Sequence, residues 1–137
     1  MKVLVDSCIW SLALRRKHIE QSIYIDEFKE LITEVRVQII GAVRQEILSG
    51  IKLNKHFEIL RSSLSAFDDL ALSKADYETA ANYFNLLRSK GIQGSNTDFL
   101  ICAVSVNHEL PIFTLDKDFT MFQKYIPIQL HNPRNFG

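Results

Sequence analysis

The chain has 137 residues, 47% of them hydrophobic, and its 16 basic and 16 acidic residues cancel. A chain of this length and composition fits one domain, residues 1–137, whose core needs neither disulfides nor a structural metal. The balanced charge excludes the globally basic class of nucleic-acid-binding protein, so a polyanion would have to be held by a local site.

The first half of the chain alternates short apolar runs with longer amphipathic ones. Its predicted elements, in chain order, are a strand at Val3–Val5, a helix at Ser7–Leu14, an amphipathic helix at Ile19–Val35, a strand at Val37–Ile40, a turn at Gly41 and a helix at Ala42–Ser49 closed by Gly50. Each strand is thus followed by a helix, which is the pattern of right-handed βαβ units around a parallel sheet.

The second half continues the alternation. Its predicted elements are a helix near Lys55–Leu64, an extended piece at Leu70–Leu72, a helix from Ser73 to Arg88, a helix that Asp98 enters in its first turn and that contains the apolar run Phe99–Val104, a strand at Ile112–Leu115, a helix at Lys117–Tyr125 and an edge strand at Ile128–Leu130. The fold class expected from both halves is α/β with a central parallel sheet.

The apolar stretches are all short. Val3–Val5 ends at Asp6 and is too short for the core of a signal peptide, and no uncharged stretch is long enough to span a bilayer. Cys8 and Cys102 lack the spacing of a zinc site, so we interpret both as small buried residues in a reducing compartment. We therefore expect a cytoplasmic protein without membrane contact.

Four acidic residues stand where an apolar strand or helix should leave the core. Asp6 follows Lys-Val-Leu-Val and Asp116 follows Ile-Phe-Thr-Leu, whereas Glu46 and Asp98 come at the front of helices that follow turns. The carboxyl ends of parallel strands form the edge where open α/β sheets bind ligands. If the fold brings the four together, they form an all-oxygen pocket of the kind that suits Mg²⁺ or Mn²⁺.

Each acid also has an ordinary explanation when it is taken alone. Asp98 can interact with a helix N-terminus, Glu46 can be a solvated helix residue, and Asp116 and Asp118 can be turn formers. The joint placement favours a site, because a carboxylate after an apolar strand is costly unless it is hydrogen-bonded or bound to a cation.

Four segments carry a family resemblance: Val-Asp-Ser-Cys-Ile-Trp at 5–10, Arg-Gln-Glu-Ile-Leu-Ser-Gly at 44–50, Asp-Phe-Leu-Ile-Cys-Ala at 98–103 and Phe-Thr-Leu-Asp-Lys-Asp-Phe at 113–119. In their order and spacing they resemble the PIN domain, specifically the VapC-type toxins of toxin–antitoxin pairs, over essentially the whole chain. The resemblance implies a Mg²⁺- or Mn²⁺-dependent endoribonuclease on a three-layer α/β/α sandwich. It also implies a homodimer that a cognate antitoxin protein inhibits.

The resemblance also implies residue roles by motif position. The metal-binding and catalytic acids would be Asp6, Glu46, Asp98 and Asp116, with Ser7, Thr114 and Asp118 in support. We assign Asp6 and Asp98 to a primary metal, and Glu46 with Asp116 or Asp118 to a second ion or a water. Whether one ion or two act, and what Asn96 does, stay open at this point.

The RNA substrate must be held beside these acids by cations. Candidate phosphate contacts are Arg15, Arg16, Lys17, Arg44 and Lys117, each of which is otherwise a solvated surface cation. Trp10 and Phe119 lie near the acids in sequence and would either stack on a base or pack in the core.

Two other functions remain as alternatives. A response-regulator receiver also places acids at the ends of parallel strands and binds Mg²⁺, but its paired acids, later phosphorylatable Asp and Lys do not occur at the required spacing here. A metal-binding PIN-like regulatory module without nuclease activity is the second alternative, and an activity assay separates it from the enzyme.

Overall fold

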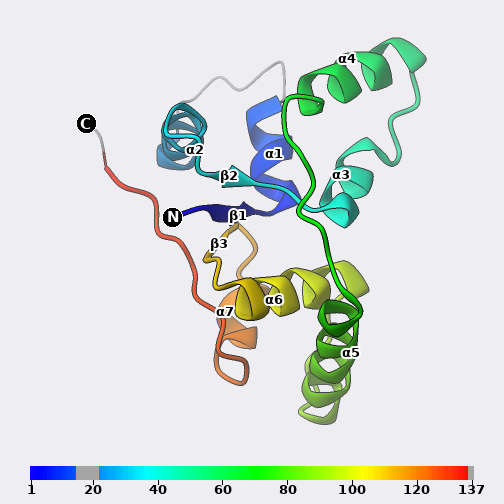
Figure 1. Cartoon of the computed structure of the whole chain (residues 1–137), viewed down its shortest axis with the longest axis vertical. Coiled ribbons are helices and arrows are strands. Elements are labelled where there is room, and N and C mark those ends of the chain that lie inside the picture. Colours follow the sequence, from blue (N-terminus) through cyan, green and yellow to red (C-terminus); the bar gives the residue numbers. More distant parts are fainter. Residues whose placement is uncertain (15–21, 136–137) are drawn as a thin grey trace.

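The computed structural model describes residues 1–14 and 22–135, and a parallel sheet lies at its centre (Figure 1). The strands are β1 (Val3–Val5), β2 (Val37–Gln38) and β3 (Ile112–Phe113), in the order β2-β1-β3. Every residue of β1 is fully buried, as the central strand of a sheet covered on both faces must be. The predicted parallel sheet is confirmed.

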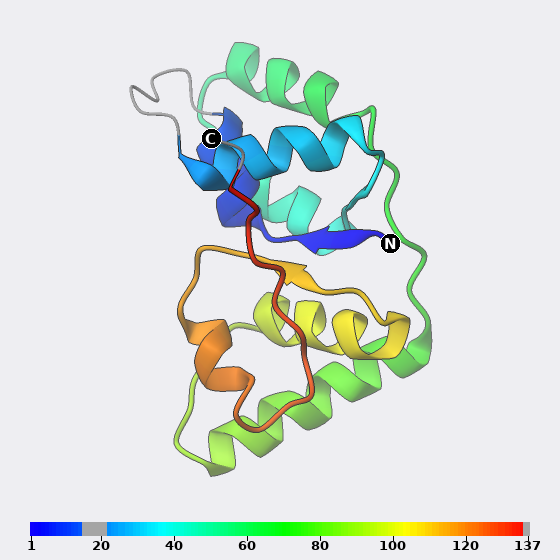
Figure 2. The same ribbon diagram turned by 90° about the vertical axis from the view of Figure 1, so that its left-hand side faces the viewer.

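Seven helices lie among the described residues: α1 (Ser7–Leu14), α2 (Ile23–Thr33), α3 (Gly41–Leu48), α4 (Asn54–Leu64), α5 (Lys74–Ser89), α6 (Asn96–His108) and α7 (Asp118–Phe122). In two perpendicular views α1 to α4 lie on one side of β1 and α5 to α7 on the other (Figures 1 and 2). The α/β/α sandwich is therefore confirmed. No helix in the described ranges has the length and apolarity needed to cross a bilayer.

Most predicted elements occur with shifted ends, but two predicted extended pieces do not form strands. Gly41 was expected in a turn but is the first residue of α3, because extended Ile40 caps that helix. Leu70–Leu72 is not a strand; its neighbour Asp69 makes one parallel bridge to Ile39. The predicted edge strand at Ile128–Leu130 is reduced to one bridge between Leu130 and Ile112.

The long predicted helix Ile19–Val35 is observed as α2. Its N-cap is Ser22, whose Oγ accepts a hydrogen bond from the Ile25 backbone N–H at 3.1 Å. Val35 has a φ of 56°, which a β-branched residue adopts only at a chain reversal, so the helix has ended before it. The part of the prediction that precedes Ser22 includes residues outside the described ranges.

The two aromatic residues that could have stacked on a base belong to the core. Phe119 has no exposed surface, and Trp10 is 2% exposed. The Trp10 ring meets Phe28 and Phe67 edge-on, each at 4.9 Å between ring centroids, and its Nε1 donates to the Val5 carbonyl at 3.3 Å. The core-packing interpretation is confirmed for both residues.

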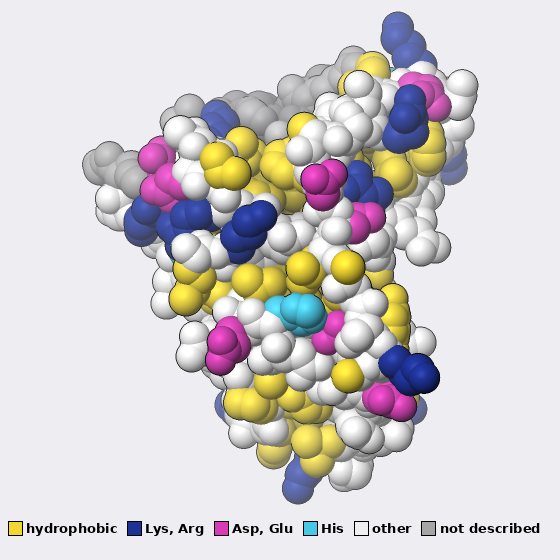
Figure 3. Space-filling model, viewed as in Figure 1, with side chains coloured by type: hydrophobic (Ala, Val, Ile, Leu, Met, Phe, Trp, Pro, Cys, Tyr) yellow, Lys and Arg dark blue, Asp and Glu magenta, His cyan; other side chains and the backbone are white. Residues whose placement is uncertain are grey.

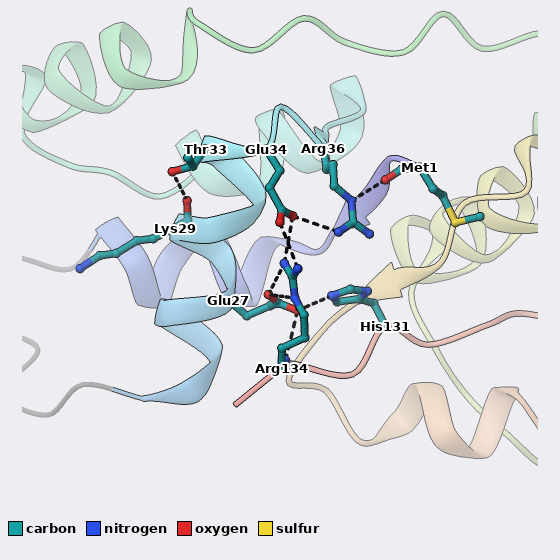
Figure 4. Close-up of polar contacts among 8 residues, drawn as sticks. All are labelled: Met1, Glu27, Lys29, Thr33, Glu34, Arg36, His131 and Arg134. Atoms are coloured by element: carbon teal, nitrogen blue, oxygen red, sulfur yellow. Dashed lines mark hydrogen bonds and ion pairs between the residues drawn. The ribbon is translucent and has the colours of Figure 1, made fainter. Parts of the chain in front are cut away.

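The segment that follows α7 is tied to α2 by a buried acid, Glu27 (Figure 4). Arg134 Nε donates to Glu27 Oε1 at 2.9 Å, and His131 Nε2 lies 2.7 Å from Glu27 Oε2. The Arg134 guanidinium also reaches Glu34 at 2.9 Å and 3.0 Å. These contacts hold residues 130–134, the C-terminal strap, beside β3.

A second buried acid joins α5 to α6. Asp76 accepts hydrogen bonds from the Ser73 backbone N–H and Asn107 Nδ2, each at 3.0 Å, and His108 Nε2 lies 3.0 Å away. Burial opposes ionisation of this carboxyl, but the hydrogen bonds outweigh it and lower the pKa of Asp76 to about 2. The network therefore favours the charged carboxylate and fixes α6 against α5.

Replacing Asp76 by Asn should destabilise the fold at neutral pH by about 2 kcal/mol, the order of a buried hydrogen-bonded carboxylate. Because the folded-state pKa is depressed from 3.8 to about 2, this stabilisation is present above pH 3.8 and lost as pH falls towards 2. Urea unfolding at neutral pH and at pH about 2.5 measures the effect. The exposed Glu78→Gln on the same helix is the control, and a destabilisation by Asp76→Asn that does not shrink at low pH would contradict the explanation.

Candidate active site

Asp6 stands at the carboxyl end of β1 and is 5% exposed. Its Oδ1 accepts the Ser7 backbone N–H at 2.8 Å, and its Oδ2 accepts the hydroxyl of Thr114 at 2.7 Å. Thr114 directly follows β3, so the parallel pairing of β1 and β3 brings these two residues together. Burial raises the pKa of Asp6 even though these hydrogen bonds favour its charged form.

Glu46 approaches Asp6 from α3. The Ser7 hydroxyl, at the start of α1, donates a hydrogen bond to Glu46 Oε1. Next to burial, the negative charge of Glu46 adds a smaller contribution to the raised pKa of Asp6. Glu46 is exposed, and the Ser7 hydroxyl orients its side chain towards Asp6.

Asp98 is placed by the cap of α6. The Asp98 backbone N–H donates to Ser95 Oγ at 3.0 Å, and Asp98 Oδ2 accepts the Ser95 backbone N–H at 3.1 Å. This capping box fixes the side chain on the first turn of a helix whose next residues, Phe99–Ser105, are buried. Burial raises the pKa of Asp98, and the negative charges of Asp6 and Asp116 add to the effect.

The loop between β3 and α7 carries the remaining acids. The Asp116 backbone N–H donates to Thr114 Oγ1 at 3.0 Å, and the Asp118 backbone N–H donates to Asp116 Oδ1 at 2.9 Å. Thr114 therefore donates to Asp6 while it accepts from Asp116, which connects two of the acids through one hydroxyl. The side chain of Asp118 is exposed on the first turn of α7.

The structure thus brings Asp6, Glu46, Asp98 and Asp116 to one edge of the sheet. None of them forms an ion pair with a Lys, Arg or His among residues 1–14 and 22–135. Like charges in a half-buried place, without a cationic partner, repel one another, and a divalent cation relieves this repulsion. The donor set consists of carboxylate and hydroxyl oxygens, which suits a hard cation.

The acids do not yet enclose an ion. Within the described ranges, no group of three or more His, Cys, Asp or Glu side chains is arranged to hold a metal. Asp98 and Asp116 each use one carboxylate oxygen in a local hydrogen bond, and the other oxygen makes none to a described residue. The donor chemistry therefore fits a divalent cation, and closing a coordination shell requires side-chain rotation, for which exposed Glu46 is suited.

The predicted phosphate contacts differ in their surroundings. Arg44 Nε donates to Asp69 and its Nη1 donates to the Leu64 carbonyl, each at 3.0 Å, and its Nη2 donates to the Phe67 carbonyl. This guanidinium is therefore used to attach α3 to the segment after α4. Lys117 is exposed beside Asp116. Three further candidates lie outside the described residues: Arg15, Arg16 and Lys17.

Cys8 belongs to the site although the sequence suggested only a packing role. Its Sγ lies 3.5 Å from Asp6 Oδ2 and 3.3 Å from Thr114 Oγ1, and it accepts the Leu115 backbone N–H at 3.2 Å. Burial, with the charge of Asp6 adding to it, raises the pKa of the Cys8 thiol. It therefore stays a neutral donor to Asp6. Its position two residues after that acid, in the first turn of α1, was the available signal.

One face of the molecule carries charged side chains of both signs. On the side that Figure 3 shows, basic and acidic side chains are interspersed, with hydrophobic side chains exposed between them. This agrees with the balanced composition.

Comparison with solved structures finds chains of the same fold. The crystal structure of FitAcB from Neisseria gonorrhoeae has a chain of similar fold, with a TM-score of 0.75 at 19% identity over 96% of this chain and 97% of that one. VapBC2 from Rickettsia felis, bound to a DNA fragment from its promoter, has a TM-score of 0.71 at 19% identity, over 96% of this chain and 98% of that one. VapBC-5 from Mycobacterium tuberculosis, a member of the VapBC family of toxin–antitoxin systems, has a TM-score of 0.67 at 16% identity, over 94% of this chain and 96% of that one.

No curated protein matches the sequence. A family model does match, over residues 3–124, which include all four acids, Ser7, Thr114 and Asp118. With the parallel sheet and the acids gathered at its carboxyl edge, this match shows that the chain belongs to the PIN domain family.

Proposed function

We propose that this protein, as a single domain over residues 1–137, is a divalent-metal-dependent endoribonuclease and the toxin of a VapBC-type toxin–antitoxin pair. The observation that carries the proposal is the gathering of Asp6, Glu46, Asp98 and Asp116 at one sheet edge without a cationic partner among the described residues. Membership of the PIN family and the fold shared with VapBC structures support it.

The chemistry follows from the charges. Carboxylates alone repel a phosphodiester, so the site needs a Mg²⁺ or Mn²⁺ ion, which when bound would lower the pKa of a water and neutralise charge on the phosphate. Asp6 and Asp98 would hold the primary ion, with Glu46 and Asp116 or Asp118 completing the shell or binding a water. Thr114 and Ser7 orient Asp6 and Glu46 through the hydrogen bonds described above. Cys8 supports the same oxygen of Asp6 that Thr114 holds.

Of the two alternatives, the receiver is excluded by membership of the PIN family. A PIN-like metal-binding module without nuclease activity keeps the same acids and differs only in turnover. The cleavage assay below decides between the module and the enzyme.

Asp98→Asn should lower the rate of RNA cleavage by roughly 100-fold or more while the domain stays folded. The amide keeps an oxygen for the Ser95 N–H, so the cap of α6 survives, but the charge that holds the cation is lost. Removing a repelling charge should leave the metal-free melting temperature equal to or above that of the wild type. Cleavage of single-stranded RNA with Mg²⁺ or Mn²⁺, together with thermal unfolding, measures both effects.

The control for this test is Asp68→Asn, an exposed acid on the segment beside β2, whose backbone carbonyl accepts a hydrogen bond from Gln38. It should cleave like the wild type. Near-wild-type cleavage by Asp98→Asn, in a preparation free of contaminating nuclease, would refute the proposed role of the acids.

The antitoxin would bind near α2, α3 and α4. The end of α1 and the start of α4 enclose an apolar hollow of about 200 Å³, and Ile59 on α4 is 42% exposed beside it. An amphipathic segment laid into a groove of this kind buries the exposed apolar side chains. A basic side chain on that segment, directed at the acids, would satisfy them as a cation does.

Ile59→Glu should weaken the complex with the product of the neighbouring antitoxin gene by about tenfold or more, because it places a charge in the apolar contact. RNA cleavage by the free protein should not change. Leu86→Glu on α5, 39% exposed in the wild type, is the matched control. Binding of the purified partner measured by calorimetry tests this, and equal affinity of the two variants would contradict the proposed groove.

The proposed homodimer needs a second apolar surface. One candidate is a hollow of about 460 Å³ between α3, α5 and α6, in which Tyr77 is 56% exposed and Phe84 and Leu100 form the floor. A second copy covering this hollow would remove apolar surface from water. Tyr77→Lys should then convert a dimer into a monomer in light scattering, whereas the exposed Lys74→Ala should not. A dimeric Tyr77→Lys protein would place the interface elsewhere.

A further inference from the structure

A small hollow adjoins the acids on the side of the C-terminal strap. Its volume is about 180 Å³. Seven of its lining residues offer polar groups: Tyr24, Thr114, Asp116, Lys117, Thr120, His131 and Asn132. Because Thr114 and Asp116 also belong to the acidic site, the hollow and the acids share a wall. Whatever enters the hollow therefore lies next to the position where a phosphate would react.

The walls of the hollow are held in place before any ligand binds. The Tyr24 ring stacks on Phe113 of β3, with centroids 6.0 Å apart and planes at 20°, and His131 packs edge-on against the same ring at 5.3 Å. Glu27 fixes both His131 and Arg134 of the C-terminal strap (Figure 4). A site whose walls are already ordered loses little entropy when it binds a ligand.

Three side chains around the hollow keep their hydrogen-bonding groups free. Within the described residues, the hydroxyl of Tyr24, the ammonium of Lys117 and the amide of Asn132 make no hydrogen bond to the protein, whereas the Thr120 hydroxyl donates to the Lys117 carbonyl at 2.6 Å. Apolar side chains of Ile112, Leu115, Leu130 and Pro133 line the rest. A flat group with apolar faces and a polar edge fits such a lining, and an anionic group attached to it would meet Lys117.

We propose that this hollow is a base-binding subsite, which receives the nucleotide next to the phosphate that is cleaved. The inference rests on the proposed endoribonuclease function. Single-stranded RNA is read by unstacked bases that pack on side-chain faces while their edges accept and donate hydrogen bonds. Asn132, with one donor and one acceptor group, reads the edge of the base, and Lys117 contacts the neighbouring phosphate.

Substitutions of Asn132 and Lys117 should have different effects on RNA cleavage. An amide that reads a base edge carries sequence information, whereas a lysine that contacts a phosphate carries none. Asn132→Ala should therefore flatten the base preference at one position beside the cut by about tenfold. Lys117→Gln should lower cleavage of all sequences alike. The exposed Asn82 on α5 lines none of the described hollows, so Asn82→Ala should change neither rate nor preference.

The experiment is cleavage of an RNA pool with randomised positions, followed by sequencing of the cut ends, for the wild type and the three variants. A base preference that Asn132→Ala weakens and Asn82→Ala retains supports the subsite. The same preference in the wild type and Asn132→Ala, or no preference in the wild type, overturns the subsite and leaves the nuclease intact. Loss of antitoxin binding by Asn132→Ala, with its RNA preference unchanged, also overturns it and assigns the hollow to the protein partner.

If the wild type cleaves no RNA, the proposed function fails and a binding measurement decides the subsite separately. The four 5′-mononucleotides are titrated into isotopically labelled wild-type protein, and the side-chain amide signal of Asn132 is followed by NMR. A shift of this signal that saturates with one of the nucleotides supports the base subsite. An unchanged signal at millimolar nucleotide overturns it.

Discussion

The hydrogen bond from Thr114 to the buried carboxylate of Asp6 is the contact on which the site depends. It joins the ends of two paired strands and holds a charge where the surrounding core disfavours it. Glu46 and Asp98 place two further negative charges near Asp6. Gathered like charges of this kind oppose folding rather than stabilise it. In the proposed function they would bind a cation and, through it, a phosphate.

The same fold contains buried acids of a different kind, and the contrast supports this explanation. Although burial opposes it, hydrogen bonds from Arg134 and His131 lower the pKa of Glu27, and His108 with other donors lowers that of Asp76. Both acids have a basic partner, and each joins two elements. Asp6 and Asp98 have no such partner among the described residues, and burial raises the pKa of each. Asp6 and Asp98, which have no basic partner, are therefore the acids suited to binding a cation.

The sequence predicted the sheet well, and Asp6 and Asp116 follow strands as expected, because apolar runs that end in Asp report directly on strand ends. Glu46 was expected at the front of a helix but lies in the second half of α3. Gly41 misled the prediction, since the extended Ile40 before it already served as the cap of α3. Other features depend on contacts between residues far apart in the chain. Local pattern could not predict three of these contacts. They are the hydrogen bond of Arg44 to the Leu64 carbonyl, the contact of Cys8 with Thr114, and the anchoring of residues 130–134 by Glu27.

The central claim is that the gathered acids form a divalent-cation site, and calorimetric titration of the metal-free protein with Mn²⁺ tests it most directly. The claim predicts saturable binding by the wild type and by Asp68→Asn, and its loss in the double variant Asp6→Asn, Asp98→Asn, with all three proteins folded. Equal Mn²⁺ affinity of the wild type and the double variant would contradict it.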